Sequence, residues 1–367
     1  MLVYLLLIFI SVLLIIFQNS TIYKIENTRR ILFYLLTFCL FLLMILRSSN
    51  VGTDYLAYNG YFYSTSFALK SQYIENGYIL LNEVAQELGI FLIIPAFEFI
   101  ISYFGMYKLS TVFKTNSFAF LGFYILTYVY MQSFNALRQF IAIGFICFGC
   151  VFLFSQKRSR YLLFIFFIFL AYEFHSSSLI MIFLPLLSRI RVTKSITFMM
   201  MVLTSVLFFT GWGFKITQPL IGLNSHYATK YGGDTGFLIS TGSKGLVQFI
   251  PVLIQFIMLI MYLYIQENNS INLDKNHTLL SKKNNFIFSG YLIFLMLYAA
   301  GGNGVVDRIQ FFFFPIVIIA NILFYDSRSY LDFKMFIYRS VLLAFWVLYC
   351  ILRLVMNNAG VVPYSFK

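Results

Sequence analysis

Charge is scarce in this sequence, and acidic charge most of all. Only 11% of the 367 residues are charged, and 13 Asp and Glu stand against 26 Lys and Arg. An ordinary soluble domain carries about 25% charged residues. Here 60% of the residues are hydrophobic, 20% are aromatic and the mean hydropathy is +0.84. These values exclude a soluble domain of ordinary composition and predict a polytopic membrane protein.

Cysteines and familiar catalytic motifs are also few. Each of the four cysteines lies inside an apolar run, where packing is the expected role. They are Cys39, Cys147, Cys150 and Cys350. We therefore predict no disulfide framework, zinc site or redox site, although two of them form a C-x-x-C. The chain has no P-loop, dinucleotide fingerprint, Ser-His-Asp elbow or metal-ligand spacing, so no metal and no cofactor are predicted.

The net charge of +13 lies in short interhelical loops rather than on one soluble face. A nucleic-acid-binding protein would need its Lys and Arg residues gathered on one soluble face, so nucleic acid is excluded as a partner. With both termini outside, six predicted inner loops hold 17 of the 26 Lys and Arg, which the positive-inside rule favours. These are Lys24, Arg29, Arg30, Lys108, Lys114, Lys157, Arg158, Arg160, Arg189, Arg191, Lys194, Lys275, Lys282, Lys283, Arg328, Lys334 and Arg339.

Apolar stretches separated by polar breaks predict about twelve transmembrane helices in an all-α fold. The expected spans are 1–17, 31–46, 91–107, 117–134, 138–154, 160–173, 176–188, 195–211, 246–265, 286–299, 309–325 and 340–356. The first lacks a basic leader and a small-residue cleavage site, so we interpret it as a helix rather than a signal peptide. We treat residues 1–367 as a single multipass transmembrane domain.

The stretch 160–188 is short for two spans, because each normally needs about 17–25 residues. A single span would turn the later basic loops outward, so we predict a short hairpin whose turn, residues 173–178, is recessed below the outer surface. Two long outer segments, 47–90 and 212–245, are expected to face the substrate. Within the first, residues 76–88 have apolar positions near helical spacing and predict an interfacial helix.

Four arginines lie at the ends of apolar runs on the predicted outer side: Arg47, Arg138, Arg308 and Arg353. Cations are costly there without an anionic partner, which points to a lipid-linked diphosphate or a similar anion. Arg138 opens a helix at its positive end, and guanidinium groups bind phosphate oxygens bidentately. Snorkelling to lipid headgroups is the alternative for Arg47 and Arg138. A local ion pair with Asp307 is the alternative for Arg308.

His175 and Asp54 are the candidate bases. A neutral imidazole in a recessed turn can take a proton from a sugar hydroxyl near neutral pH. The alternatives are a hydrogen-bonded structural histidine and an aspartate that caps a turn. Glu173 is a candidate to orient His175, although its spacing alone does not establish this.

Several short motifs follow one another along nearly the whole chain. They are Arg47, Val51-Gly52-Thr53-Asp54-Tyr55, Tyr58, Asn135-Ala136-Leu137-Arg138-Gln139, Phe174-His175-Ser176-Ser177 and Val362-Pro363-Tyr364. In this order they resemble the EpsG-like branch of the Wzy-type polysaccharide polymerases. Ser178 stands where that pattern usually has a small residue, often Ala, and the family is not expected to require Glu173.

The resemblance implies a GT-C-like multipass enzyme of the bacterial cytoplasmic membrane with an active-site cavity at the outer face. Such an enzyme transfers an undecaprenyl-diphosphate-linked glycan to a hydroxyl of another lipid-linked repeat unit, building O-antigen, capsule or exopolysaccharide. A chain-length regulator and a flippase are candidate partners, besides membrane lipid. The expected catalytic residues are His175, Asp54 and Arg138. The expected substrate-binding residues are Arg47, Arg308, Arg353, Gln139, Glu173, Asp307 and Tyr55.

Two other classes share some of these features. A flippase of the same lipid would also place cations toward a cavity, but the chain has no evident internal repeat. A membrane O-acyltransferase would share the embedded histidine without an obvious need for several outer arginines. The sugars joined, the linkage, the stereochemical course and the oligomeric state are left open by the sequence.

Overall fold

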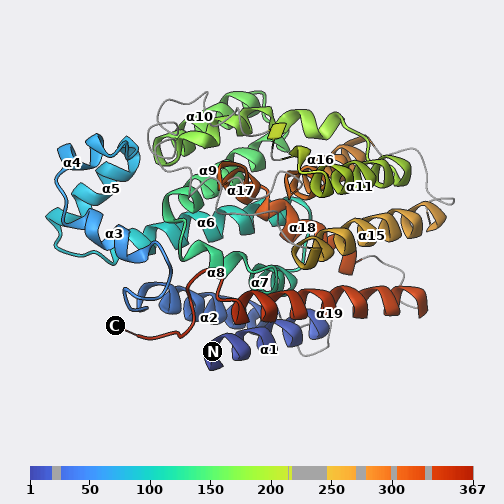
Figure 1. Cartoon of the computed structure of the whole chain (residues 1–367), viewed down its shortest axis with the longest axis horizontal. Helices are drawn as coiled ribbons and strands as arrows, with labels where there is room; N and C mark the ends of the chain where they lie inside the picture. Colours follow the sequence, from blue (N-terminus) through green and yellow to red (C-terminus); the bar gives the residue numbers. More distant parts are fainter. Residues whose placement is uncertain are drawn as a thin grey trace. The chain divides into compact units, whose positions relative to one another are not determined.

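The described part of the chain is all-helical (Figure 1). The computed structural model describes residues 1–18, 26–213, 215–216, 246–269, 278–298, 304–326 and 333–366. The helices are α1 (Leu2–Phe17), α2 (Glu26–Ile45), α3 (Tyr55–Phe62), α4 (Ser66–Ser71), α5 (Asn76–Glu87), α6 (Ile93–Val112), α7 (Ser117–Leu126), α8 (Val129–Ser133), α9 (Leu137–Leu153), α10 (Arg160–Phe174), η2 (Ser176–Arg189), α11 (Lys194–Phe209), α15 (Leu246–Asn269), α16 (Thr278–Leu297), α17 (Gly304–Phe311), α18 (Phe314–Tyr325) and α19 (Phe333–Val355). Within these ranges the β contact recorded is an isolated bridge between Arg47 and Phe366. The all-α prediction is confirmed for this part of the chain.

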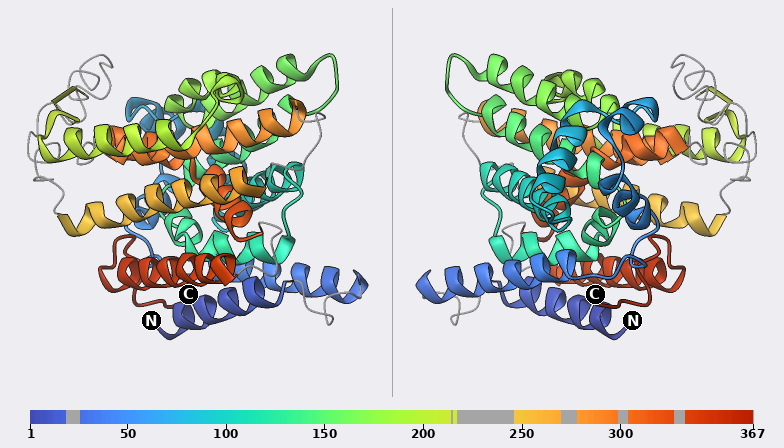
Figure 2. Two further views of the ribbon diagram at one scale, coloured as in Figure 1. Left: turned by 90° about the vertical axis from the view of Figure 1, so that its right-hand side faces the viewer. Right: turned by 90° about the vertical axis from the view of Figure 1, so that its left-hand side faces the viewer.

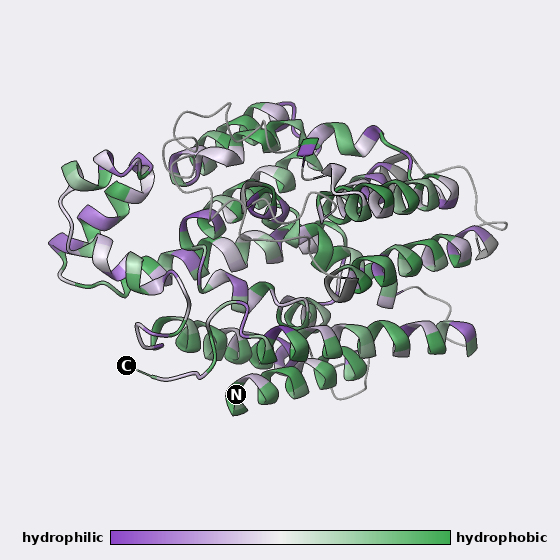
Figure 3. Ribbon diagram, viewed as in Figure 1, coloured by the Kyte–Doolittle hydropathy of each residue, from purple (hydrophilic) through white to green (hydrophobic). Residues whose placement is uncertain are grey.

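Three helical stretches are long and apolar enough to cross a membrane: Asn27–Ile45, Phe249–Glu267 and Phe333–Val355. Shorter apolar helices accompany them, including α1, α9 and α11. In Figure 3, α1, α2 and α19 are hydrophobic over most of their length, whereas α3, α4 and α5 are mixed. A helix overlaps each expected span, but twelve complete crossings and an outer cavity stay predictions.

Helix α10 shows the surface expected of a protein surrounded by lipid. Phe164, Ile168 and Ala171 are buried on the face that packs against α9. On its other face Leu162 is 71% exposed and Phe169 is 56% exposed. A helix that is apolar on its packed face and on its exposed face fits hydrocarbon surroundings better than water.

The expected helix 117–134 is wrong in one respect, because the chain breaks at Tyr128. Helix α7 ends at Leu126 and α8 begins at Val129, and between them Tyr128 has a φ of 68°. A residue with a left-handed backbone conformation interrupts the α-helical hydrogen-bond pattern. For residues other than glycine this conformation costs about 1–2 kcal/mol. Neither Gly nor Pro marks this break, so the continuous apolar pattern concealed it.

The break predicted within residues 173–178 is present at His175, whose backbone is extended between α10 and η2. The segment that follows, Ser176–Arg189, is a 3-10 helix. Such a helix rises about 2.0 Å per residue, against about 1.5 Å in an α-helix. Ser176–Arg189 therefore extends further than an α-helix of equal length, which eases the shortage of residues between 160 and 188.

The chain divides into two compact units, Met1–Ile182 with Asn321–Lys367, and Phe183–Ala320. In the first unit α9 packs against α6 and α10, and α1 lies beside α7 and α19, as Figure 2 also shows for α1 and α19. Glycines allow the contact of α6 with α9: a Cβ on Gly105 would lie 2.5 Å from the carbonyl oxygen of Gly144. Both Cys147 and Cys150 are free and buried on α9, while Cys39 is free and exposed on α2.

The second unit contains α11, which packs against α15 and α16, and α17, which contacts α16. Phe208 and Phe249 stack with ring centroids 4.3 Å apart. The Tyr291 hydroxyl lies 3.0 Å from Gln255 Oε1 and donates a hydrogen bond to it. The treatment of the whole chain as one domain stays a prediction.

The segment 47–90, predicted to lie outside, holds more helix than expected, since α3 and α4 precede α5. Helix α5 confirms the helix predicted at 76–88, and its position on a membrane surface stays a prediction. Most of the second predicted outer segment, 212–245, lies outside the described residues.

Candidate active site

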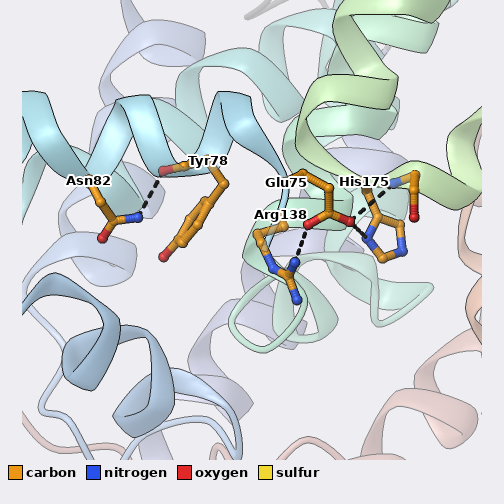
Figure 4. Close-up of polar contacts among 6 residues, drawn as sticks. Glu75, Tyr78, Asn82, Arg138 and His175 are labelled. Atoms are coloured by element: carbon orange, nitrogen blue, oxygen red, sulfur yellow. Dashed lines mark hydrogen bonds and ion pairs between the residues drawn. The ribbon is translucent and has the colours of Figure 1, made fainter. Parts of the chain in front are cut away.

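Three ionisable side chains from separate segments of the first unit meet around the carboxylate of Glu75 (Figure 4). Glu75 Oε2 accepts a hydrogen bond from Arg138 Nη1. Glu75 Oε1 lies 3.5 Å from His175 Nδ1 and accepts a hydrogen bond of 3.1 Å from the Ser176 backbone N–H. The side chains of Glu75, Arg138 and His175 are only 14%, 13% and 6% exposed, so water screens their charges weakly. We call these three residues the Glu75 cluster.

Local structure explains how Glu75 reaches its partners. Glu75 directly precedes α5 with an extended backbone, and its side chain makes no capping bond to its own helix. Two residues later, a Cβ on Gly77 would lie 2.8 Å from the carbonyl oxygen of Glu173 at the end of α10. Glycine therefore lets the start of α5 approach α10 closely, and this places the Glu75 carboxylate beside His175.

Arg138 and His175 are presented by helix ends. Arg138 is the second residue of α9, and His175 is the residue after the last turn of α10. The His175 backbone N–H donates to the carbonyl of Ala171 at 2.9 Å, which fixes the backbone where the chain leaves the helix. Both side chains thus start from backbone that is held by helical hydrogen bonds.

The Glu75 carboxylate is ionised at neutral pH. Its burial raises the pKa, but the hydrogen bond with His175, the positive charge of Arg138 and the Ser176 N–H outweigh this effect and lower the pKa to about 2. An ionised carboxylate only accepts hydrogen bonds, so a neutral imidazole in this contact would carry its hydrogen on Nδ1. The same tautomer keeps a lone pair on Nε2, the atom that a general base uses.

Arg138 retains hydrogen-bonding capacity beyond its ion pair. A guanidinium has five N–H donors, and within the described part of the chain Arg138 Nε is buried without a hydrogen-bond partner. The Arg138 guanidinium also lies 5.9 Å from the ring centroid of Tyr78, whose neighbours are Tyr58 and Tyr61 at 5.7 and 6.5 Å. Asn82 Nδ2 donates to the backbone carbonyl of Tyr78 at 2.9 Å (Figure 4). Arg138 therefore stands between a carboxylate and a group of aromatic rings.

The other candidate base, Asp54, lies in different surroundings. It is exposed at the start of α3 and accepts a hydrogen bond of 3.3 Å from the hydroxyl of Thr53.

Glu173 is half-buried, and the carboxylate that contacts His175 belongs to Glu75 instead. The orienting role expected for Glu173 is therefore better filled by Glu75.

Arg47 is completely buried and does not reach the surface. Its guanidinium lies between the rings of Tyr55 and Phe134, at 3.9 and 4.3 Å from their centroids. Its Nη2 donates to the carbonyl of Phe134 at 3.0 Å, and its Nη1 lies 2.9 Å from Met44 Sδ. These contacts favour an internal role for Arg47 and for Tyr55 over the expected contact with substrate.

The remaining candidates lie on α9, α17 and α19. Arg353 lies over the rings of Tyr128 and Tyr349, at 5.2 and 6.0 Å, and its Nε is buried without a hydrogen-bond partner in the described ranges. Gln139 is buried in α9 next to Arg138. Asp307 and Arg308 are half-buried in α17, in the second unit. Their expected contact with substrate stays a prediction.

Sequence reasoning missed Glu75, the residue at the centre of the site. Its partner Arg138 lies 63 residues further along the chain, so no local pattern connects them. An acidic residue before a helix is also what an ordinary helix start would show. The nearby Gly77 was the available indication that this helix start approaches other backbone closely. Among the described residues no group of three His, Cys, Asp or Glu side chains is arranged to hold a metal ion.

Comparison with models of known families matches residues 30–366 to one of them, the EpsG family. The match includes every residue of the Glu75 cluster. Comparisons with curated proteins and with solved structures find no significant match.

Proposed function

Because the chain belongs to the EpsG family of Wzy-like polymerases, we propose that it joins lipid-diphosphate-linked oligosaccharide repeat units into a polysaccharide. The carrier lipid we propose is undecaprenyl diphosphate, and the reaction takes place at the outer face of the bacterial cytoplasmic membrane. The family and the apolar helices identify a multipass membrane protein. The observation that supports the chemistry best is the Glu75 cluster, where one buried carboxylate contacts both an imidazole and a guanidinium.

In the proposed step, His175 is the general base. Its Nε2 takes the proton of an acceptor hydroxyl while that oxygen attacks the anomeric carbon of the donor glycan. The bond from the anomeric carbon to the lipid diphosphate breaks, and the lipid diphosphate leaves with its electron pair. Glu75 stabilises the imidazolium that forms, because its ionised carboxylate lies 3.5 Å from Nδ1. A direct displacement of this kind inverts the anomeric centre.

Arg138 is proposed to hold the diphosphate that develops negative charge as it leaves. The negative charge of Glu75 balances the positive charge of Arg138. With a neutral His175, the Glu75 cluster therefore carries no net positive charge. Additional cations are therefore needed for a leaving diphosphate, and Arg353 is a candidate within the same unit, since its Nε is buried without a partner in the described part of the chain. No nucleotide sugar takes part, because the lipid-linked glycan is itself the activated donor.

The decisive experiment uses purified protein in nanodiscs with a lipid-diphosphate-linked repeat unit and follows the ladder of products by gel. We expect a ladder from the wild-type protein and none from His175→Ala or Arg138→Ala. Glu87→Gln is the matched control, because Glu87 is an exposed carboxylate on α5 outside the Glu75 cluster. Transfer of labelled lipid across the bilayer of sealed proteoliposomes without a ladder would identify a flippase, and consumption of an acyl donor would identify an O-acyltransferase.

A further inference from the structure

The turn at residues 134–136, which leads directly into α9 and Arg138, is held by three segments that lie far from it in the sequence. We propose that residues 357–366, called here the C-terminal arm, act together with Gly52 and Arg47 to position Arg138 for the reaction. The inference rests on the proposed function, and it assigns a role to motif residues that do not belong to the Glu75 cluster.

The first contact comes from the C-terminal arm. Asn135 Nδ2 donates a buried hydrogen bond of 2.7 Å to the carbonyl of Ala359. The same carbonyl accepts from the backbone N–H of Thr53 at 3.3 Å, and the next carbonyl, that of Gly360, accepts from the N–H of Gly52 at 2.9 Å. The C-terminal arm thus joins the turn before α9 to the segment before α3.

The second contact comes from Gly52, which packs directly on the turn. A Cβ on Gly52 would lie 2.8 Å from Asn135 Oδ1 and 3.1 Å from the carbonyl oxygen of Phe134. Its φ of 106° also lies in the region that favours glycine. Any side chain at this position would push the turn away or strain its backbone.

The third contact comes from Arg47, whose Nη2 donates to the Phe134 carbonyl at 3.0 Å. A fully buried guanidinium is costly unless its donors find acceptors, and this carbonyl is one that the turn offers. The aromatic rings on either side of Arg47 prevent it from moving sideways. The turn is therefore held at two consecutive residues, through the carbonyl of Phe134 and the side chain of Asn135.

The C-terminal arm is itself anchored at points outside the Glu75 cluster. The hydroxyl of Tyr4 donates to the Val361 carbonyl at 2.9 Å, and that of Tyr364 donates to the Leu43 carbonyl at 2.8 Å. The Ser48 N–H donates to the Ser365 carbonyl at 2.8 Å. With these anchors on α1 and at the end of α2, the arm can resist displacement of the turn.

The turn controls Arg138 because α9 grows directly from it. The first helical bond here runs from the Phe140 N–H to the carbonyl of Ala136 at 2.8 Å, and Arg138 lies between these two residues. A displacement of the turn therefore moves the Arg138 backbone with respect to Glu75. Misplacing a reacting group by about 1 Å can cost about a hundredfold in rate, so a loosened turn is expected to lower kcat more than it raises KM.

The test is Asn135→Ala, which removes the bond to the C-terminal arm without substituting any residue of the Glu75 cluster. In the ladder assay with the lipid-diphosphate-linked repeat unit we expect kcat to fall about tenfold or more with KM within about threefold of wild type. Tyr364→Phe, which removes one anchor of the arm, should show a smaller fall in the same direction. Asn358→Ala is the control, because Asn358 is an exposed residue of the arm.

A double variant separates positioning from general stability. If Asn135 acts through Arg138, then Asn135→Ala combined with Arg138→Lys should be no more than about twofold slower than Arg138→Lys alone. Independent losses that multiply would overturn the proposal, as would a lowered Tm with unchanged kcat. If Asn135→Ala does not accumulate in the membrane, Tyr364→Phe carries the same comparison. Failure of the wild-type protein to form a ladder would overturn the proposed polymerase function instead.

Discussion

Replacing Glu75 by Gln removes the one negative charge that Arg138 and His175 share, with little change in side-chain size. The pKa of Glu75 lies at about 2, against an ordinary value of 4.5. At about 1.4 kcal/mol per pKa unit, this difference corresponds to ~3.5 kcal/mol in favour of the ionised carboxylate in its folded surroundings. This difference combines the effects of His175, Arg138 and the Ser176 N–H against the cost of burial, so the imidazolium that forms when His175 takes a proton would lose only a part of it.

We therefore expect Glu75→Gln to lower kcat about tenfold to a hundredfold, since a loss of about 1.4–2.7 kcal/mol corresponds to one to two powers of ten in rate. The assay is the ladder reaction in nanodiscs at a saturating concentration of the repeat unit, with Glu87→Gln as the matched carboxylate control. Thermal unfolding of each variant must be measured in parallel, because removing one partner of a buried ion pair also costs stability. A folded Glu75→Gln protein with kcat within about threefold of wild type would refute the assignment of Glu75 to the reaction.

Three further predictions follow from the same contacts. Arg138→Lys keeps the charge but loses the forked donor geometry, so ladder formation should fall at least tenfold in the same assay, and an unchanged rate would argue against bidentate phosphate contact. Gly77→Ala should lower Tm, because its Cβ would lie 2.8 Å from the Glu173 carbonyl, whereas Gly60→Ala in α3 meets no atom within 4 Å and should not. Because the pKa of Glu75 is lowered on folding, its stabilising contribution is complete above pH 4.5 and is lost as the pH falls toward 2, so acid unfolding measured by circular dichroism should be shallower in Glu75→Gln than in wild type over this range.

The helices were predictable from the sequence because long apolar runs leave few alternatives in a chain with so little charge. The break at Tyr128 could not be predicted, because neither Gly nor Pro lies at the position where the backbone becomes left-handed. The 3-10 geometry of Ser176–Arg189 likewise leaves no distinct mark in an apolar pattern.

The candidate site was predictable only in part. Arg138 and His175 were identified because charged groups at helix ends of a membrane protein are exceptional. Glu75 was missed because its partners come from distant segments. Arg47 looked the same in sequence as a snorkelling or ligand-binding arginine, and only its burial between Tyr55 and Phe134 indicates an internal role.

The free thiols provide built-in reporters of helix separation. Cys147 and Cys150 are buried on α9, the helix that begins next to Arg138, whereas Cys39 is exposed on α2. A small membrane-permeant alkylating reagent should therefore reach the α9 thiols only when that helix parts from its neighbours, whereas Cys39 is accessible to it at all times. Mass spectrometry of the native protein could in this way record the opening of α9 during turnover, with no engineered label near the reacting groups.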